Sequence, residues 1–185
     1  GSRDTNVLYT NLYNKKSKTL YKHKHWVNCV CITPDNKWIL SGSEDKKVIL
    51  YNIVESKYTN IYHHSNQIRC VAMTPDTKHI IIGSTGYNII HLRRTSKNIE
   101  VRELKGHTDW VNSVCISHDA QYVLSGSSDK SIILWDLLNN KKKVLQGHYS
   151  QVTSVAMTPD ANFAISGSND KSIILWNLSN CINRF

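Results

Sequence analysis

The sequence predicts an all-β fold built from repeated four-stranded antiparallel units, on three observations. First, a histidine recurs at intervals of 41, 43 and 41 residues, at His23, His64, His107 and His148. Second, a glycine and an aspartate keep the same intervals, at Gly42, Gly83, Gly126 and Gly167 and at Asp35, Asp76, Asp119 and Asp160. Third, Val, Ile, Tyr, Thr and Ser gather in short clusters, which favours strands over helices. A period of about 40 residues indicates a repeat architecture.

The third copy shows the elements of one repeat most clearly. Gly106 and His107 open it, and residues 111–116 alternate as a strand. Residues 117–120 predict a turn in which Asp119 accepts a hydrogen bond from nearby backbone. Residues 122–126 predict a second strand, 128–130 a tight turn, 131–136 a third strand, and 141–145 a weaker, more polar fourth strand. Four strands per period are typical of one blade of a β-propeller.

These repeats resemble the WD-repeat family over nearly the whole chain. The motifs that carry the resemblance are Gly106-His107 with Trp135-Asp136, and Gly147-His148 with Trp176-Asn177. The resemblance implies one segment of WD-type β-propeller over residues 1–185. We expect four full repeats, at about 23–63, 64–106, 107–147 and 148–185, after a partial blade at 1–22.

The repeat count predicts an open arc rather than a closed ring. Residues 7–9 and 19–21 resemble the third and fourth strands of a preceding blade, and 182–185 resemble the start of a fourth strand. A common WD propeller has seven blades, so at this period a ring needs about 290 residues. We expect the arc to be part of a larger ring, closed by another chain or by a further segment.

A His, a Ser and an Asp recur together in three copies and imitate a catalytic triad. An aromatic residue follows each Asp by six positions. The sets are His107, Ser125, Asp129 and Trp135; His148, Ser166, Asp170 and Trp176; and His23, Ser41, Asp45 and Tyr51. A nucleophilic serine has no reason to appear once per blade, and no G-x-S-x-G elbow is present. Trp to Ser to His to Asp is instead a chain in which every donor finds an acceptor. We therefore expect structural hydrogen bonds and no catalytic residues.

The second copy departs from this set. Ile82 replaces the Ser, Gly86 the Asp and Leu92 the Trp, and only His64 remains. Loss of the partners together fits a buried network, because removing a single member would strand the others.

Charge, cysteine content and the absence of targeting motifs bear on metal binding, cofactors and cellular location. The chain has 23 Lys and Arg against 14 Asp and Glu, a net charge of +9, and five cysteines. Cys29 and Cys31 align with small residues in other copies, so we expect packing rather than metal binding, and no cofactor motif occurs. No signal peptide or membrane span is predicted. We expect an intracellular protein, cytoplasmic in the first instance, with the nucleus left open.

The function favoured by the sequence is a non-enzymatic scaffold for protein–protein interaction, within a multiprotein complex. The resemblance implies that partners contact residues flanking the innermost strand and the tight turn. Carried over by position, these are Trp26, Asn28, Glu44, Gln67, Arg69, Thr85, Trp110, Asn112, Ser128, Gln151, Thr153 and Asn169. Trp26 and Trp110 could be interface anchors or could pack against a neighbouring blade.

A nucleic-acid-associated propeller is the alternative function. Basic groups follow the predicted outer rim, at Lys15, Lys16, Lys18, Lys22 and Lys24, at Arg93 and Arg94, and at Lys141, Lys142 and Lys143. They could contact phosphates of RNA or DNA. We favour the simpler interpretation, in which lysines protect exposed edge strands from pairing, because no stacking pattern of aromatic residues accompanies them.

Overall fold

The computed structural model describes residues 2–95 and 98–179 and contains five antiparallel sheets. A two-stranded sheet comes first, made of β1 (Asn6–Thr10) and β2 (Ser17–Lys22). Blade 1 contains β3 (Val27–Ile32), β4 (Trp38–Ser43), β5 (Lys47–Asn52) and β6 (Lys57–His63). Blade 2 contains β7 (Ile68–Met73), β8 (His79–Ser84), β9 (Ile89–Arg94) and β10 (Ile99–Leu104).

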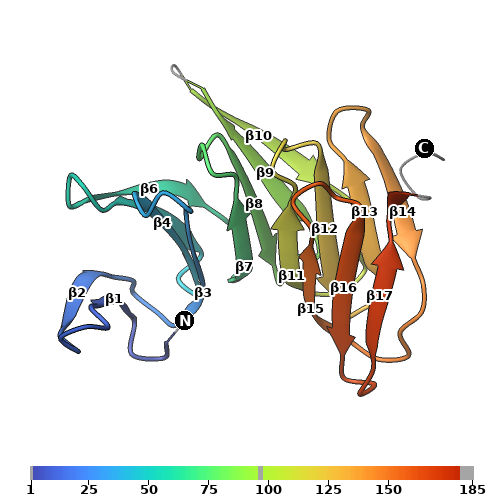
Figure 1. The fold of residues 1–185 in the computed structure, drawn as a ribbon, viewed down its shortest axis with the longest axis horizontal. Coiled ribbons are helices and arrows are strands. Elements are labelled where there is room, and N and C mark those ends of the chain that lie inside the picture. The colour runs from blue at the N-terminus through green and yellow to red at the C-terminus, as the bar shows by residue number, and fades with distance from the viewer. Residues whose placement is uncertain (1, 96–97, 180–185) are drawn as a thin grey trace.

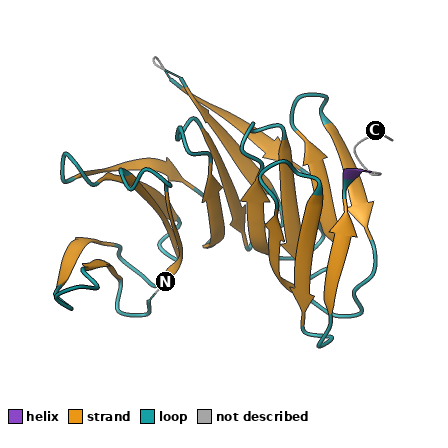
Figure 2. Ribbon diagram, viewed as in Figure 1, coloured by secondary structure: helices purple, strands orange, loops and turns teal. Residues whose placement is uncertain are grey.

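Blades 3 and 4 complete the described chain. Blade 3 contains β11 (Val111–Ile116), β12 (Tyr122–Ser127), β13 (Ile132–Asp136) and β14 (Lys141–Leu145). Blade 4 contains β15 (Val152–Met157), β16 (Phe163–Ser168) and β17 (Ile173–Asn177). In every blade, strands adjacent in sequence pair with each other (Figure 2). The strands predicted for the third repeat agree with β11 to β14 within one residue at each end. The fourth strand predicted at 182–185 lies outside the described residues.

Local sequence fixes the turn between the first two strands of each blade. In blade 3, Asp119 Oδ1 accepts hydrogen bonds from the Ser117 hydroxyl at 2.6 Å and from the Gln121 N–H at 3.0 Å. The equivalent aspartates of the other blades, Asp35, Asp76 and Asp160, make the same pair of bonds. An aspartate side chain that binds backbone two residues ahead stabilises a tight turn, as the sequence predicts.

The blades stack side by side into an arc that does not close (Figure 1). The innermost strands β3, β7, β11 and β15 contact one another in that order. The core lies between adjacent blades: Leu124 and Leu134 of blade 3 pack with Val152 and Val155 of blade 4. This confirms the predicted arc of stacked antiparallel blades.

A glycine on the second strand allows this close stacking. A Cβ atom added at Gly126 would lie 2.5 Å from a methyl group of Val152 in the next blade. A Cβ atom added at Gly42 would likewise collide with Ile68, and one added at Gly83 would collide with Val111. The repeated glycine therefore leaves room for a β-branched residue of the neighbouring innermost strand.

Blade 4 has one face that no other described blade covers. No atom lies within 4 Å of a Cβ built at Gly167, in contrast to the three glycines of the other blades. Ile173 and Leu175 are 74% and 71% exposed, and Phe163 and Ile165 are also exposed. Their equivalents in blade 3 are buried under blade 4, so this surface has the composition of a blade interface without its partner.

Candidate protein-interaction face

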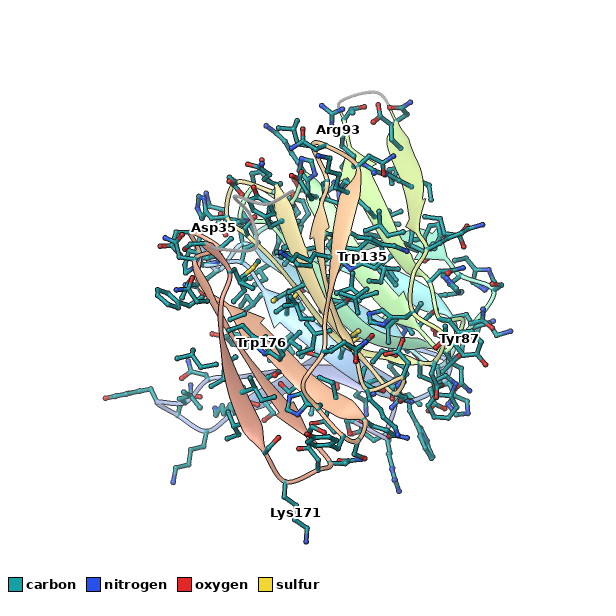
Figure 3. The ribbon with its side chains drawn as sticks, turned by 90° about the vertical axis from the view of Figure 1, so that its right-hand side faces the viewer. Asp35, Tyr87, Arg93, Trp135, Lys171 and Trp176 are labelled. Carbon is teal, nitrogen blue, oxygen red and sulfur yellow. The ribbon has the colours of Figure 1, made fainter. Side chains whose placement is uncertain are left out.

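Two opposite ends of the blades carry the connecting loops (Figure 3). Lys171 and Tyr87 project from one end of the stack, and Asp35 and Arg93 lie at the other. We call the first end the loop face. It is formed by residues 23–26, 64–67, 105–110 and 146–151, and by the tight turns 43–47, 84–88, 127–131 and 168–172.

A continuous series of side-chain hydrogen bonds runs through blade 3 to the loop face. The Trp135 indole N–H donates to Ser125 Oγ at 2.9 Å. Ser125 Oγ lies 2.8 Å from His107 Nε2, and His107 Nδ1 lies 2.8 Å from Asp129 Oδ2. Because an ionised carboxylate only accepts, His107 carries its proton on Nδ1 and the Ser125 hydroxyl donates to Nε2. The chain thus satisfies each of these groups.

Several donors hold the Asp129 carboxylate at the end of this chain. The Thr108 N–H donates to Oδ2 at 3.0 Å, and the Ser131 N–H donates to Oδ1 at 2.9 Å. Partial burial by itself would raise the pKa of Asp129. Hydrogen bonds from His107, Ser131 and the Thr108 N–H outweigh it and hold the pKa well below its ordinary value. Asp129 is therefore ionised and fixed in place at neutral pH.

Blade 4 repeats the arrangement with Trp176, Ser166, His148 and Asp170. The indole N–H to Ser166 Oγ distance is 2.8 Å, and His148 lies 2.8 Å from Ser166 and 2.9 Å from Asp170. Hydrogen bonds, first of all from Ser172, hold the pKa of Asp170 well below its ordinary value.

Blade 1 differs from the sequence prediction at one position. His23 lies 2.8 Å from Ser41 Oγ and 3.0 Å from Asp45 Oδ2, as in the other blades. The donor to Ser41 is the hydroxyl of Tyr21, at 2.9 Å, and not the predicted Tyr51. Tyr51 is buried and stacks on Tyr21, with ring centroids 5.3 Å apart. The prediction failed because Tyr21 lies on β2, outside the blade; a tyrosine two residues before the repeat histidine was the available signal.

The serine of each His–Ser–Asp set is buried, which bears on whether it could act as a nucleophile. Ser125 is 0% exposed, and Ser41 and Ser166 are also buried. A serine nucleophile must reach its substrate. These hydroxyls instead lie inside packed blades, where each is hydrogen-bonded to an aromatic side chain and to a histidine. The arrangement acts as a structural clamp that ties the loop before the innermost strand to the tight turn.

Blade 2 keeps the histidine but not its partners. His64 is buried, and its Nδ1 accepts a hydrogen bond from the Asn66 N–H at 2.8 Å. Burial lowers the pKa of His64, so the ring is neutral at pH 7, with its proton on Nε2. Blade 2 therefore presents a different local structure on the loop face.

Two tryptophans stand on the loop face, each under an arginine. The Arg3 guanidinium carbon lies 4.7 Å from the centroid of the Trp26 ring, and that of Arg69 lies 4.9 Å from the Trp110 ring. Trp26 is 39% exposed and Trp110 is 45% exposed. Each ring is thus both packed within the chain and open on one side. Arg–aromatic stacking of this kind stabilises exposed side chains by about 0.5–1 kcal/mol.

The remaining predicted contact residues fall into three groups. Asn28 and Asn112 donate from their side chains to the backbone carbonyls of Ile68 and Val152 in the next blade, and Asn112 also accepts from Arg69. Ser128 is buried and accepts from Asn112, so it offers almost no surface to a partner. The others lie at or near the surface. Glu44 forms an ion pair with His25 at 2.9 Å, and the Thr153 hydroxyl donates to the Gly167 carbonyl. Thr85 is half-buried, and the exposed residues are Gln67, Gln151 and Asn169.

Some of the basic groups of the rim are engaged within the chain. The Lys142 ammonium donates to the Lys105 carbonyl at 2.7 Å and lies 5.6 Å from the Trp135 ring centroid. Arg94 donates to Thr77 Oγ1 at 3.0 Å and lies over Trp38. These contacts give the two side chains a role in blade packing.

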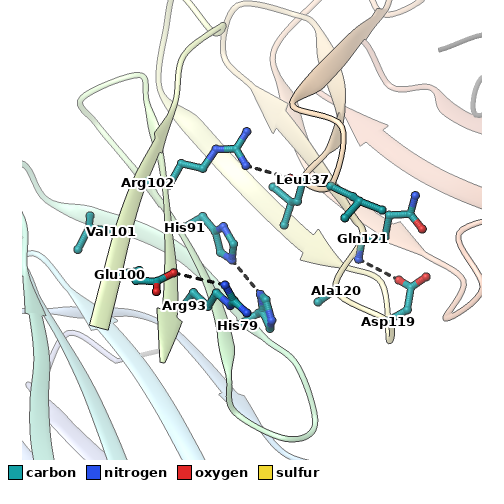
Figure 4. A pocket seen from close by; sticks show the side chains of 11 residues that line it. His79, His91, Arg93, Glu100, Val101, Arg102, Asp119, Ala120, Gln121 and Leu137 are labelled. Atoms are coloured by element: carbon teal, nitrogen blue, oxygen red, sulfur yellow. Dashed lines mark hydrogen bonds and ion pairs between the residues drawn. The ribbon is translucent and has the colours of Figure 1, made fainter. Parts of the chain in front are cut away.

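A pair of histidines lines a cavity of about 610 Å³ between blades 2 and 3 (Figure 4). His79 Nδ1 and His91 Nε2 are 3.0 Å apart, and the rings are stacked with centroids 5.2 Å apart. Burial, followed by the charge of His79, lowers the pKa of His91 to about 4. The equivalent positions are Trp38 and Leu50 in blade 1, and Tyr122 and Leu134 in blade 3. The sequence signal, two polar residues at apolar repeat positions, was missed.

Within residues 2–95 and 98–179, no group of three or more His, Cys, Asp or Glu side chains could hold a metal ion. Over the same residues, no helix has the length and apolar content needed to cross a bilayer.

The stacked antiparallel blades, and the buried Trp–Ser–His–Asp chains of blades 3 and 4, define a β-propeller segment with a loop face. The chain belongs to the WD-repeat family: the WD domain, G-beta repeat matches residues 14–52, 55–90, 98–136 and 139–177. The first match begins before β2, and each later match begins before the fourth strand of one blade. Every match extends into the third strand of the blade that follows.

Curated relatives match single stretches of the chain. Nuclear distribution protein PAC1 of Candida albicans is 49% identical over 37 residues, which are 20% of this chain and 8% of that protein. Small ribosomal subunit protein RACK1 of Dictyostelium discoideum is 51% identical over 43 residues, 23% of this chain and 13% of that protein. Pre-mRNA-splicing factor PRP46 of Yarrowia lipolytica is 42% identical over 43 residues, which are 23% of this chain and 10% of that protein. The chain thus matches only a small part of each relative's length.

Proposed function

We propose that this chain is a non-enzymatic scaffold that binds partner proteins through its loop face. The observation that carries the proposal is the presence of Trp26 and Trp110 at equivalent positions of blades 1 and 3, each half-exposed and held by an arginine. A large aromatic side chain already fixed in place loses little conformational entropy when a partner covers it. Tryptophan and arginine are also the residues most enriched at binding hot spots.

The buried hydrogen-bond chains support this function by making the face rigid. In blade 3, Asp129 fixes the tight turn, while His107 and Thr108 fix the loop beside it. Arg69 of blade 2 donates to Asn112 of blade 3 at 3.1 Å, which ties the two blades together at the face. A preorganised surface of this kind can hold several partners without changing shape.

We further propose that the arc works within a larger, intracellular assembly. Two relatives are named for the small ribosomal subunit and for pre-mRNA splicing. The uncovered apolar face of blade 4 has the glycine and the aliphatic side chains of an internal blade interface. Another chain, or a further segment, would cover it. We place the protein in the cytoplasm in the first instance.

Affinity measurements on two variants test the binding face. A partner is first isolated from native extract and identified by mass spectrometry. We expect Trp110→Ala to weaken its binding by about 2 kcal/mol or more. The triple variant Lys141→Ala, Lys142→Ala, Lys143→Ala should change mainly the association rate and its salt dependence. If the triple variant abolishes binding and Trp110→Ala leaves it intact, the rim is the binding site and the proposal fails.

A further inference from the structure

Blades 1, 3 and 4 each hold a carboxylate at the same place on the loop face. In blade 3, Asp129 receives the Thr108 N–H, the Ser131 N–H and the His107 ring. Asp45 and Asp170 receive the equivalent three donors in blades 1 and 4. Two backbone N–H groups and one imidazole therefore form a recurring carboxylate site.

Blade 2 retains the donors of this site but lacks its carboxylate. Gly86 occupies the aspartate position, while Ser65 and Asn88 stand where Thr108 and Ser131 stand in blade 3. Among the described residues, the backbone N–H groups of Ser65 and Asn88 have no hydrogen-bond partner. His64 is only 7% exposed, and its Nε2 has no partner in that part of the chain either. Ser65 is exposed and Asn88 is half-buried, so an acceptor from outside the chain can reach these donors.

An open cavity lies at the vacated position. Its volume is about 330 Å³, and its walls include His64, Ser65, Asn66, Gly86 and Asn88. A Cβ atom at Gly86 would collide with the Asn66 side-chain amide, which leans over the glycine. That amide ends a flexible side chain and donates one N–H to Ser65 Oγ at 3.1 Å, which leaves its other N–H as a further donor. The cavity is therefore polar and rich in donors, and it opens on the loop face.

One acidic residue lines the same cavity, and its charge is compensated. Glu103 accepts from the Asn88 side-chain amide at 2.7 Å and pairs with the Lys105 ammonium at 3.3 Å. Burial is the main cause of the lowered pKa of His64; the charge of Glu103 raises this pKa, while His63 and Lys46 lower it. The local balance of charge thus leaves room for one more carboxylate.

We propose that the blade 2 cavity binds the carboxylate of an aspartate or glutamate side chain presented by the partner protein. The incoming carboxylate takes the place that Asp45, Asp129 and Asp170 fill in the other blades, and it accepts hydrogen bonds from Ser65, Asn88 and His64. This inference rests on the proposed function, because it places the partner on the loop face. On this proposal, blade 2, which lacks the internal hydrogen-bond chain, is the blade that binds the negative charge of the partner.

Acetate serves as a probe for the site without any partner. We expect the His64 ring resonances to shift saturably in an NMR titration with sodium acetate, against sodium chloride at equal ionic strength. The rings of His23, His107 and His148 act as internal controls, because their own aspartates occupy the equivalent sites. If His64 does not respond, or if all four histidines respond alike, the inference is wrong.

Two variants at one position give the matched control. Gly86→Asp restores the internal carboxylate and should reduce acetate affinity at least tenfold. Gly86→Ala adds the same Cβ and displaces the same Asn66 amide without the carboxylate, and it should keep affinity within about threefold. Equal loss in both variants would mean that the cavity shape, and not the donor set, explains the response, and would overturn the inference.

The partner experiment separates this inference from the proposed function. With the partner in hand, Gly86→Asp should weaken binding at least tenfold, and Gly86→Ala should have little effect. If Trp110→Ala weakens binding while Gly86→Asp does not, the loop face binds the partner but blade 2 recognises no carboxylate. If neither variant matters, the proposed function itself fails.

Discussion

The Tyr21 hydroxyl donates a hydrogen bond to Ser41 Oγ at 2.9 Å, although the two residues belong to different sheets. Tyr21 fills the role that an indole N–H from the third strand plays in blades 3 and 4. Burial raises its pKa to about 12, so the hydroxyl keeps its proton and remains a donor. The β1–β2 sheet is therefore joined to blade 1 by a specific polar contact as well as by packing.

Removal of single hydroxyl groups tests this contact. Tyr21→Phe should lower the free energy of unfolding by about 1 kcal/mol, because Ser41 loses its donor inside the protein. Tyr51→Phe is the matched control, since Tyr51 is equally buried and stacks on Tyr21 without bonding to Ser41. Chemical denaturation measures both. Equal destabilisation by the two variants would refute the assignment.

Loss of a carboxylate tests the hydrogen-bond chain of blade 3. Asp129→Ala leaves the His107 N–H and the Thr108 N–H without acceptors and should destabilise by about 1–3 kcal/mol. Lys130→Ala, at the exposed neighbouring position, should have an effect within about 0.5 kcal/mol. An unchanged denaturant midpoint for Asp129→Ala would contradict the structural role.

The histidine pair between blades 2 and 3 predicts a pH dependence of stability. Folding lowers the pKa of both His79 and His91, so the unfolded chain takes up protons near pH 6.5 and the folded His91 only near pH 4. The free energy of unfolding should therefore fall as the pH drops through that window. The charged groups around the pair are Asp76, Lys78, Arg93, Glu100, Arg102 and Asp119.

A leucine variant isolates this contribution. His91→Leu introduces the residue found at the equivalent positions of blades 1 and 3, and it should lose less stability than the parent between pH 7 and pH 5. His118→Ala, at an exposed position, is the control and should follow the parent curve. Parallel curves for His91→Leu and the parent, in urea denaturation at several pH values, would exclude the pair as the cause.

Alanine substitution at two equivalent glycines should have different effects on stability. Gly126→Ala should destabilise by about 1–3 kcal/mol, because its Cβ would collide with Val152 of the next blade. Gly167→Ala should be tolerated within about 0.5 kcal/mol, since nothing lies within 4 Å of its Cβ. Thermal denaturation of both variants is the measurement. A cost at Gly167 as large as at Gly126 would show that another copy or segment already covers blade 4.

The sequence by itself determined the repeat, its strands and its turns, because these depend on residues close together in the chain. The alternation at 111–116 and the Asp119 turn needed only local patterns, and both are present in the structure. The His–Ser–Asp sets were also visible, since each lies within one blade. Family resemblance then gave the architecture of the arc and the candidate loop face.

Contacts between blades were decided only by the tertiary structure. The Tyr21–Ser41 and Arg69–Asn112 bonds join residues of different sheets, and the Arg69–Trp110 stack joins blade 2 to the loop before β11. No local pattern specifies which side chains meet there. The burial of Ser128 and the cavity beside Gly86 likewise follow from how the blades and their loops pack. Strand periodicity fixes which face a residue occupies, but the stacking of one blade on the next decides what that face touches.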